Sequence, residues 1–263
     1  MDLHLAGLRA LVTGSSRGLG YETARTLASE GAQVVINARD PQRLTTAASQ
    51  IHSETGGRTE ALPGDLTDPL VPGMLVARAV EILGGLDLLV TNSGGPPSGK
   101  FEAHSDEAWQ KSIDLNLMAH VRLIREALPF LRQSKAASVL TITSYSVKQP
   151  IPNLVLSNSV RMATIGLTKS LALELGREGI RFNSILPAWT DTERVQELME
   201  ARAQINTTTA VEEIEKQARE SPMGRMGTPQ EFANMAVFLL SPCASYVTGV
   251  MLTVDGGMYK GTF

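Results

Sequence analysis

Short apolar runs alternate along this chain with longer segments that have helical periodicity. The predicted strands are 10–13, 33–38, 86–92, 138–143, 181–186 and 250–254. The predicted helices are 19–30, 41–54, 69–83, 106–132, 155–175 and 229–240. Strands that are apolar on both faces and are separated by helices are typical of a parallel sheet covered on both sides. Because the turn at Gly64 indicates a further strand before it, we expect a doubly wound α/β fold with about seven parallel strands.

The composition does not divide the chain, so we expect residues 1–263 to form a single domain. The longest departure from the strand and helix alternation is 188–228, which is mostly charged and helical. Thr209 and Glu212 have the spacing of a capping box, which predicts a folded helix. A segment in this position lies over the carboxyl ends of the strands, where such sheets bind ligands. We therefore expect 188–228 to be a helical lid over a small-molecule substrate.

Charge and composition exclude several kinds of partner. The formal net charge is −3 and charged residues make up 19% of the chain, which argues against a nucleic-acid or anionic membrane surface. Cys243 is the only cysteine and the four histidines lack the spacing of metal ligands, so we expect no metal site. The chain starts without a basic lead and has no run of 18 apolar residues, which predicts a cytoplasmic protein without a membrane partner.

A glycine-rich turn joins the first predicted strand to the first predicted helix. Glycines there permit a tight turn, and the N–H groups that open the helix can hold a diphosphate. Such a turn is also found where nothing binds, but two further polar, glycine-bearing turns follow the third and fourth strands on the same sheet edge. Together they predict a cleft for an extended ligand. The candidate binding residues in these turns are Gly14, Ser16, Arg17, Gly18, Leu19, Gly20, Asp65, Leu66, Asn92 and Gly94.

With these motifs in this order, the chain resembles the classical short-chain dehydrogenase/reductase family over essentially its whole length. The resemblance rests on TGSSRGLG at 13–20, on Asn92-Ser93-Gly94-Gly95, on the segment 183–188 and on Val254-Asp255-Gly256-Gly257. It implies a Rossmann-type fold and an oxidoreductase that uses a nicotinamide dinucleotide. It further implies that Asp65 contacts the adenine, that Pro187 belongs to a turn beside the cofactor, and that Thr192 fixes the nicotinamide end.

Cofactor choice depends on the end of the second strand. A carboxylate there binds the ribose 2′-OH of NAD and repels a 2′-phosphate. Ala38 occupies that position, and Arg39 and Arg17 are placed to reach a phosphate. We therefore expect NADP(H) to be preferred, while Asp40 beside Arg39 leaves NAD(H) possible.

The catalytic residues of the family are only half retained. Asn116 and Ser144 match its asparagine and serine, whereas its proton-donating tyrosine and ribose-binding lysine fall on Ser157 and Arg161. An alkyl hydroxyl and a guanidinium do not titrate usefully near neutral pH, although both donate hydrogen bonds. Tyr145 is an alternative proton donor only if the strand before it has already ended, and otherwise it is a packing residue.

The phase of the predicted helix 155–175 supports this alignment. Ser157, Arg161, Thr164 and Thr168 form one polar stripe, which is separate from an apolar stripe. The apolar stripe is Leu156, Val160, Ala163, Leu167 and Leu171. Additional apolar residues on this helix, among them Met162, Ile165 and Leu173, predict a subunit interface, and the resemblance implies a homotetramer.

Two functions remain open at this point. The first is an NADP(H)-dependent oxidoreductase that transfers hydride to or from a carbonyl or secondary alcohol with an altered proton donor. The second is a catalytically silent dinucleotide-binding or scaffold protein, in which Ser157 and Arg161 are solvated positions on the helix.

Overall fold

The computed structural model describes residues 1–262, and its centre is a parallel sheet with the strand order β3-β2-β1-β4-β5-β6-β7. The strands are β1 (Arg9–Val12), β2 (Gln33–Ala38), β3 (Thr59–Pro63), β4 (Leu88–Thr91), β5 (Ser138–Ile142), β6 (Arg181–Pro187) and β7 (Met251–Val254). Chain order reverses direction between β1 and β4, which is where sheets of this kind bind ligands. The doubly wound fold is therefore confirmed.

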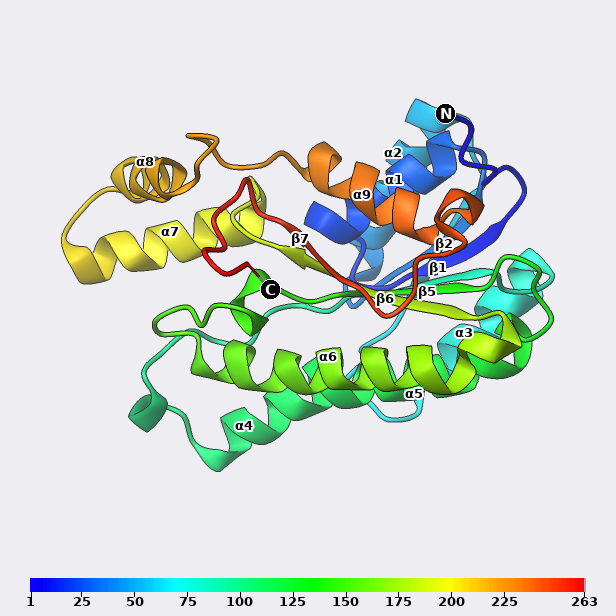
Figure 1. Cartoon of the computed structure of the whole chain (residues 1–263), viewed down its shortest axis with the longest axis horizontal. Coiled ribbons are helices and arrows are strands. Elements are labelled where there is room, and N and C mark those ends of the chain that lie inside the picture. Colours follow the sequence, from blue (N-terminus) through cyan, green and yellow to red (C-terminus); the bar gives the residue numbers. More distant parts are fainter. Residues whose placement is uncertain (263) are drawn as a thin grey trace.

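Helices cover both faces of this sheet (Figure 1). On one face lie α1 (Gly18–Ser29), α2 (Pro41–Thr55) and α9 (Pro229–Leu240). On the other lie α3 (Val71–Leu83), α4 (Asp106–Ile113), α5 (Ala119–Leu131) and α6 (Val155–Leu175). Successive strand side chains point to opposite faces, so in β1 Ala10 and Val12 enter one core and Leu11 enters the other.

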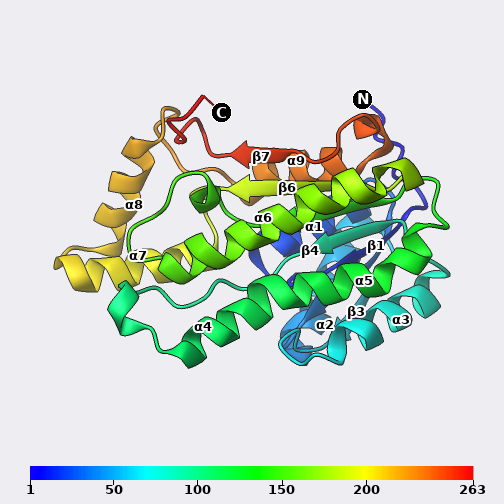
Figure 2. The same ribbon diagram turned by 60° about the horizontal axis from the view of Figure 1, so that its bottom comes forward.

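The segment 188–228 folds into α7 (Glu193–Asn206) and α8 (Ala210–Glu220), which lie beyond the ends of the strands. The arrowheads of β6 and β7 point toward these helices (Figure 2), so the pair stands at the carboxyl edge of the sheet. The predicted capping box at Thr209 and Glu212 is present. A third apolar cluster, which includes Tyr145, Trp189 and Met199, attaches α7 to the body of the protein.

Two predicted elements differ from the structure. β3 had no predicted range, because its residues alternate between half-buried and exposed and form no apolar run. The single predicted helix 106–132 is interrupted by a π-helical turn at Asp114–Met118, which divides it into α4 and α5.

Within residues 1–262, no helix is long and apolar enough to span a membrane.

Candidate active site

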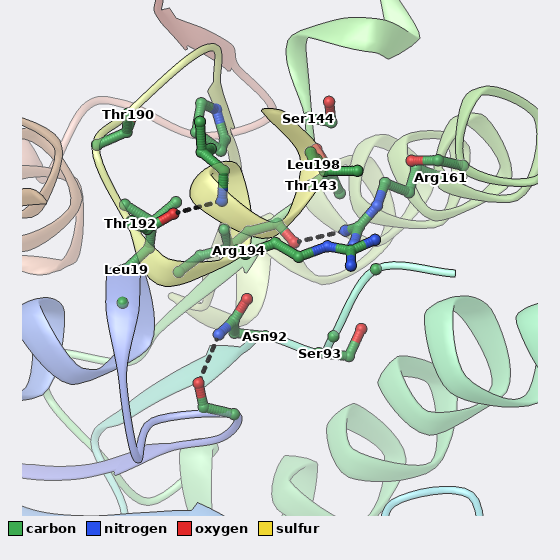
Figure 3. Close-up of a pocket in the computed structure, with 18 of the residues that line it drawn as sticks. Leu19, Asn92, Ser93, Thr143, Ser144, Arg161, Thr190, Thr192, Arg194 and Leu198 are labelled. Atoms are coloured by element: carbon green, nitrogen blue, oxygen red, sulfur yellow. Dashed lines mark hydrogen bonds between the residues drawn. The ribbon is translucent and has the colours of Figure 1, made fainter. Parts of the chain in front are cut away.

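A pocket opens at the carboxyl ends of β1, β4, β5 and β6, beneath α7 (Figure 3). It brings together predicted residues from five separate parts of the chain. Those that line it are Gly14, Arg17, Gly18, Leu19, Asn92, Gly94, Ser144, Ser157, Arg161, Pro187 and Thr192. The other predicted residues, Ser16, Gly20, Arg39, Asp65, Leu66 and Asn116, are not part of its lining.

The glycine-rich turn between β1 and α1 has the backbone geometry that close approach to a ligand requires. Gly14 and Gly18 have φ angles of +58° and +61°, which favour glycine. A Cβ atom on Gly20 would lie 2.4 Å from the Gly14 carbonyl oxygen, so a side chain there would collide with the turn. No side chain caps the first N–H groups of α1, and N–H groups in this position can hold a diphosphate.

Asn92 joins this turn to the end of β4 across the point where chain order reverses. Its Nδ2 donates to the Gly14 carbonyl oxygen at 2.9 Å, and its backbone N–H donates to Thr13 Oγ1 at 2.9 Å. The bonds hold the two loops at a fixed separation. A dinucleotide fits this arrangement, because the absence of side chains at Gly14 and Gly20 lets the two loops approach each other and leaves the backbone of the turn accessible.

The residues predicted to surround the adenine, which follow β2 and β3, are not part of the pocket lining. Ala38 ends β2, and Arg39 is exposed after it. Asp65 Oδ1 accepts hydrogen bonds from the backbone N–H and the hydroxyl of Thr67, at 3.0 and 2.9 Å, and these fix the turn after β3. Leu66 is buried against the sheet.

The polar stripe of α6 is buried, which overturns the interpretation that Ser157 and Arg161 are solvated. Ser157, Arg161, Thr164 and Thr168 are between 1% and 9% exposed. In contrast, Ala163 of the predicted apolar stripe is exposed. The reason is that the polar stripe contacts the carboxyl edge of the sheet and the π-helical turn, which offer carbonyl and hydroxyl partners. The predicted surface residue Ile165 is also buried, whereas Met162 and Leu173 are exposed.

Arg161 lies in the pocket without a carboxylate partner among the described residues. Within the described residues it makes a single hydrogen bond, in which Nη1 donates to the Ile142 carbonyl oxygen at 3.4 Å. Burial, and after it the positive charge of Arg194, lower the pKa of Arg161 to about 10. Arg161 nevertheless stays protonated at neutral pH.

Asn116 is located in the π-helical turn, behind the pocket wall. Its Oδ1 accepts a hydrogen bond from the Ser93 hydroxyl at 3.3 Å, and its carbonyl oxygen accepts one from the Thr164 hydroxyl at 2.6 Å. A π-helical turn is often found at a functional site. Here it turns the Asn116 side chain toward the loop after β4.

Sequence reasoning did not identify His120 as part of this network. Its Nδ1 lies 2.9 Å from Thr91 Oγ1 and its Nε2 lies 3.4 Å from Ser93 Oγ. Burial, and after it the charge of Arg161, lower the pKa of His120 to about 3, so the ring is neutral. In the sequence, His120 could be placed on the inner face of the helix that became α5. That position indicated that His120 is buried, but it did not indicate a place in this network.

Ser144 and Tyr145 follow the end of β5 at Ile142, so the strand has ended before both of them. Ser144 Oγ accepts a hydrogen bond from the Ser146 N–H at 3.2 Å and lines the pocket. Tyr145 also reaches the pocket, but it is 7% exposed and packs in the apolar cluster with Trp189. Burial raises the pKa of Tyr145, which makes its hydroxyl a weaker acid.

Charged residues of α7 close one side of the pocket, and sequence reasoning missed them. Arg17 donates to Glu193, and its Nη1 lies 3.1 Å from Glu197 Oε1. The hydrogen bond to Glu193 raises the pKa of Arg17. Arg194 of the same helix enters the pocket between the Leu19 side and the Arg161 side (Figure 3).

Within residues 1–262, no cluster of three or more His, Cys, Asp or Glu side chains is arranged to hold a metal ion.

Comparisons with known proteins agree with this geometry. Residues 14–259 match a family model described as enoyl-(acyl carrier protein) reductase. Dehydrogenase/reductase SDR family member 4 of Oryctolagus cuniculus is 35% identical over 258 residues, which cover 96% of this chain and 94% of that protein.

Two solved structures are similar over nearly all of the chain. L-sorbose reductase from Gluconobacter frateurii, complexed with NADPH and L-sorbose, has a TM-score of 0.94 at 32% identity, covering 99% of this chain and 100% of its own. An NADPH-bound short chain oxidoreductase from Pseudomonas aeruginosa PAO1, described as containing an atypical catalytic center, has a TM-score of 0.87 at 31% identity, covering 96% and 97%. The fold, the glycine-rich cradle and these matches show that this chain belongs to the classical short-chain dehydrogenase/reductase family of oxidoreductases.

Proposed function

We propose that the protein is an NADP(H)-dependent oxidoreductase that interconverts a carbonyl and a secondary alcohol with an altered proton donor. The observation that carries this proposal is the position of Ser144, Ser157 and Arg161, which line the same pocket as the glycine-rich cradle. A hydride donor in the cradle and hydrogen-bond donors on the other side of one pocket are what such a reaction needs.

The choice of NADP(H) rests on the surroundings of the adenine ribose. The last residue of β2 is Ala38, so no carboxylate stands there to repel a 2′-phosphate. The exposed Arg39 follows it, and Arg17 lies on the neighbouring turn. Both similar structures named above contain NADPH, which supports the same choice. NAD(H) is the alternative cofactor, and the ratio of the kcat/KM values for NADPH and NADH distinguishes the two.

In the direction of reduction, the carbonyl carbon gains a hydride and its oxygen gains a proton. Bound NADPH supplies the hydride. Ser144 and Ser157 donate hydrogen bonds to the oxygen, and the Arg161 guanidinium stabilises the negative charge that develops on it. Because neither serine is acidic enough to be a general acid near neutral pH, the proton comes from water. Asn116 holds the loop after β4 in place through Ser93.

We further propose that α7 and α8, within 188–228 of a single domain, cover the substrate side of the pocket. Arg17, Glu193 and Glu197 connect α7 to the cofactor turn, and α7 residues form part of the lining. Assembly into a homotetramer through α6 is supported by the exposure of Met162 and Leu173, at 49% and 75% of the residue surface. Light scattering of the protein and of a Met162→Lys, Leu173→Lys variant tests this assembly.

The test of activity is NADPH oxidation with a panel of ketones, quinones and acyl thioesters. The wild type is compared with Ser144→Ala and with a Ser157→Tyr, Arg161→Lys double variant. Wild-type turnover that falls about 10²-fold or more in Ser144→Ala supports the proposed enzyme. Turnover in the double variant alone contradicts it and favours a silent dinucleotide-binding protein. Quenching of intrinsic fluorescence by NADPH checks the shared premise that the cofactor binds.

A further inference from the structure

Arg161 is a buried cation whose charge no residue of the described chain compensates. It is 6% exposed, and its one hydrogen bond is to a backbone carbonyl at 3.4 Å. Its side chain projects from α6 into the pocket (Figure 3). A buried charge is costly unless it has a partner of opposite charge, so this position favours the binding of an anion.

A second guanidinium, that of Arg194, lies beside the first in the pocket (Figure 3). Arg194 comes from α7, and its charge contributes, after burial, to the lowered pKa of Arg161. Its Nη2 donates to the Pro96 carbonyl oxygen at 3.2 Å, and its Nη1 lies 3.5 Å from Glu197 Oε2. Glu197 also pairs with Arg17 and is not part of the pocket lining, so it offers Arg194 one partner at the rim and leaves Arg161 without a carboxylate among the described residues.

Each of two guanidinium groups in one pocket can donate paired hydrogen bonds, and a carboxylate accepts such pairs. The diphosphate of the cofactor has its own cradle, at the turn that carries Leu19. In Figure 3 this turn and Thr192 lie across the pocket from Ser144 and Arg161. An anion beside Arg161 therefore lies on the side of the pocket that carries Ser144.

Six large side chains that are mainly apolar form much of the remaining lining, beside smaller and polar residues such as Thr143, Thr190 and Glu193. They are Tyr145, Ile151, Leu154, Trp189, Val195 and Leu198. This lining suits the apolar body of a substrate, while Ser144 and Ser157 face its carbonyl or hydroxyl group.

We infer that the substrate is an apolar oxo acid or hydroxy acid whose carboxylate binds between Arg161 and Arg194. This inference rests on the proposed function for the reacting carbonyl, but the carboxylate site can be measured without turnover. It makes Arg194 a residue that determines substrate specificity, and it adds carboxylate binding to the role of Arg161 at the reacting oxygen.

The experiment compares acids with their neutral methyl esters. The probes are benzoylformate and 4-oxo-4-phenylbutanoate, each beside its methyl ester, added to the protein with NADP⁺ and followed by calorimetry. The wild type is expected to bind at least one acid about 10- to 100-fold more tightly than its ester, the range for hydrogen bonds between charged groups. Arg194→Met and Arg161→Met are expected to bring this ratio close to one, and Arg161→Lys to retain part of it.

Arg78→Met, on the exposed surface of α3, is the matched control and is expected to keep the wild-type ratio. If Arg161→Met does not fold, Arg194→Met alone decides, because Arg194 is only half-buried. Equal binding of each acid and its ester by the wild type overturns the inference. It is also overturned if Arg194→Met weakens NADPH binding and leaves the acid-to-ester ratio unchanged, since the anion is then the diphosphate of the cofactor.

The outcomes separate this inference from the proposed function. Preferential binding of an acid without NADPH oxidation supports the carboxylate site and contradicts the enzyme. Turnover of neutral ketones with no preference for their acid counterparts supports the enzyme and contradicts the carboxylate site.

Discussion

The Thr164 hydroxyl donates a 2.6 Å hydrogen bond to the carbonyl oxygen of Asn116, and it thereby connects α6 to the π-helical turn. Thr164→Val keeps the shape of the side chain and removes the donor. Because both residues are buried, the variant is expected to lose about 1–3 kcal/mol of the free energy of unfolding, measured in urea. NADPH oxidation is expected to fall as well, since the turn positions the Asn116 side chain. Thr164→Ser retains the hydroxyl and is the control, and equal stability of the two variants would contradict this role.

Ala38→Asp is expected to shift cofactor preference from NADPH toward NADH. The new carboxylate at the end of β2 would repel a 2′-phosphate and accept hydrogen bonds from a ribose 2′-OH. The ratio of the kcat/KM values for NADPH and NADH should fall about tenfold or more. Arg39→Met is the companion variant and should weaken NADPH alone. An unchanged ratio in both variants would assign cofactor choice to other residues.

The rate of reduction is expected to change little between about pH 6 and about pH 8, because serine and arginine do not titrate there. Since the pKa of Arg161 is about 10, activity should decline as the pH rises toward that value and the guanidinium loses its proton. Arg161→Lys should move this decline to lower pH, because a buried ammonium has a lower pKa. Steady-state kinetics across this range provide the test. A decline that disappears in Tyr145→Phe would instead make Tyr145 the proton donor.

His120 is expected to make the protein less stable at mildly acidic pH. Its pKa is about 3 in the folded state, against about 6.5 for an unperturbed histidine, so the unfolded chain binds a proton that the folded chain excludes. The stability is present above the unfolded value and declines as the pH falls from about 6.5 toward about 3. Between about pH 7 and about pH 5 the loss from this group is about 2 kcal/mol. Urea unfolding of the wild type and His120→Gln measures it, and equal pH slopes in the two proteins would refute the assignment.

Regular repetition made most of the fold predictable. Gln33–Ala38 has the predicted boundaries because apolar character and burial coincide along most of it. Val155–Leu175 also has the predicted boundaries, because its helical periodicity continues over the whole segment. Thr59–Pro63 had no predicted range because it is half-exposed near one edge of the sheet, next to β2 only. The π-helical turn at Asp114–Met118 adds no change in periodicity that a short window detects, so a continuous helix was expected there.

The site was predictable where backbone geometry demands particular residues, as at Gly14 and Gly18. It was less predictable where long side chains from different elements meet. Arg194 enters the pocket only because α7 folds back over the strand ends, and the sequence offers no sign that Arg194 and Arg161 line the same pocket. The burial of Ser157 and Arg161 was also not evident, since polar residues on a helix are usually exposed.

The buried polar stripe of α6 also changes what fixes the rotation of that helix about its axis. Burial of an apolar face does not by itself select one rotation of a helix, because the hydrophobic effect has no direction. Hydrogen bonds from Arg161, Thr164 and Thr168 have directions and defined partners, so they select one rotation. A substitution that removes one of these donors therefore loosens the alignment of the whole helix, and with it the orientation of the pocket side chains that α6 carries.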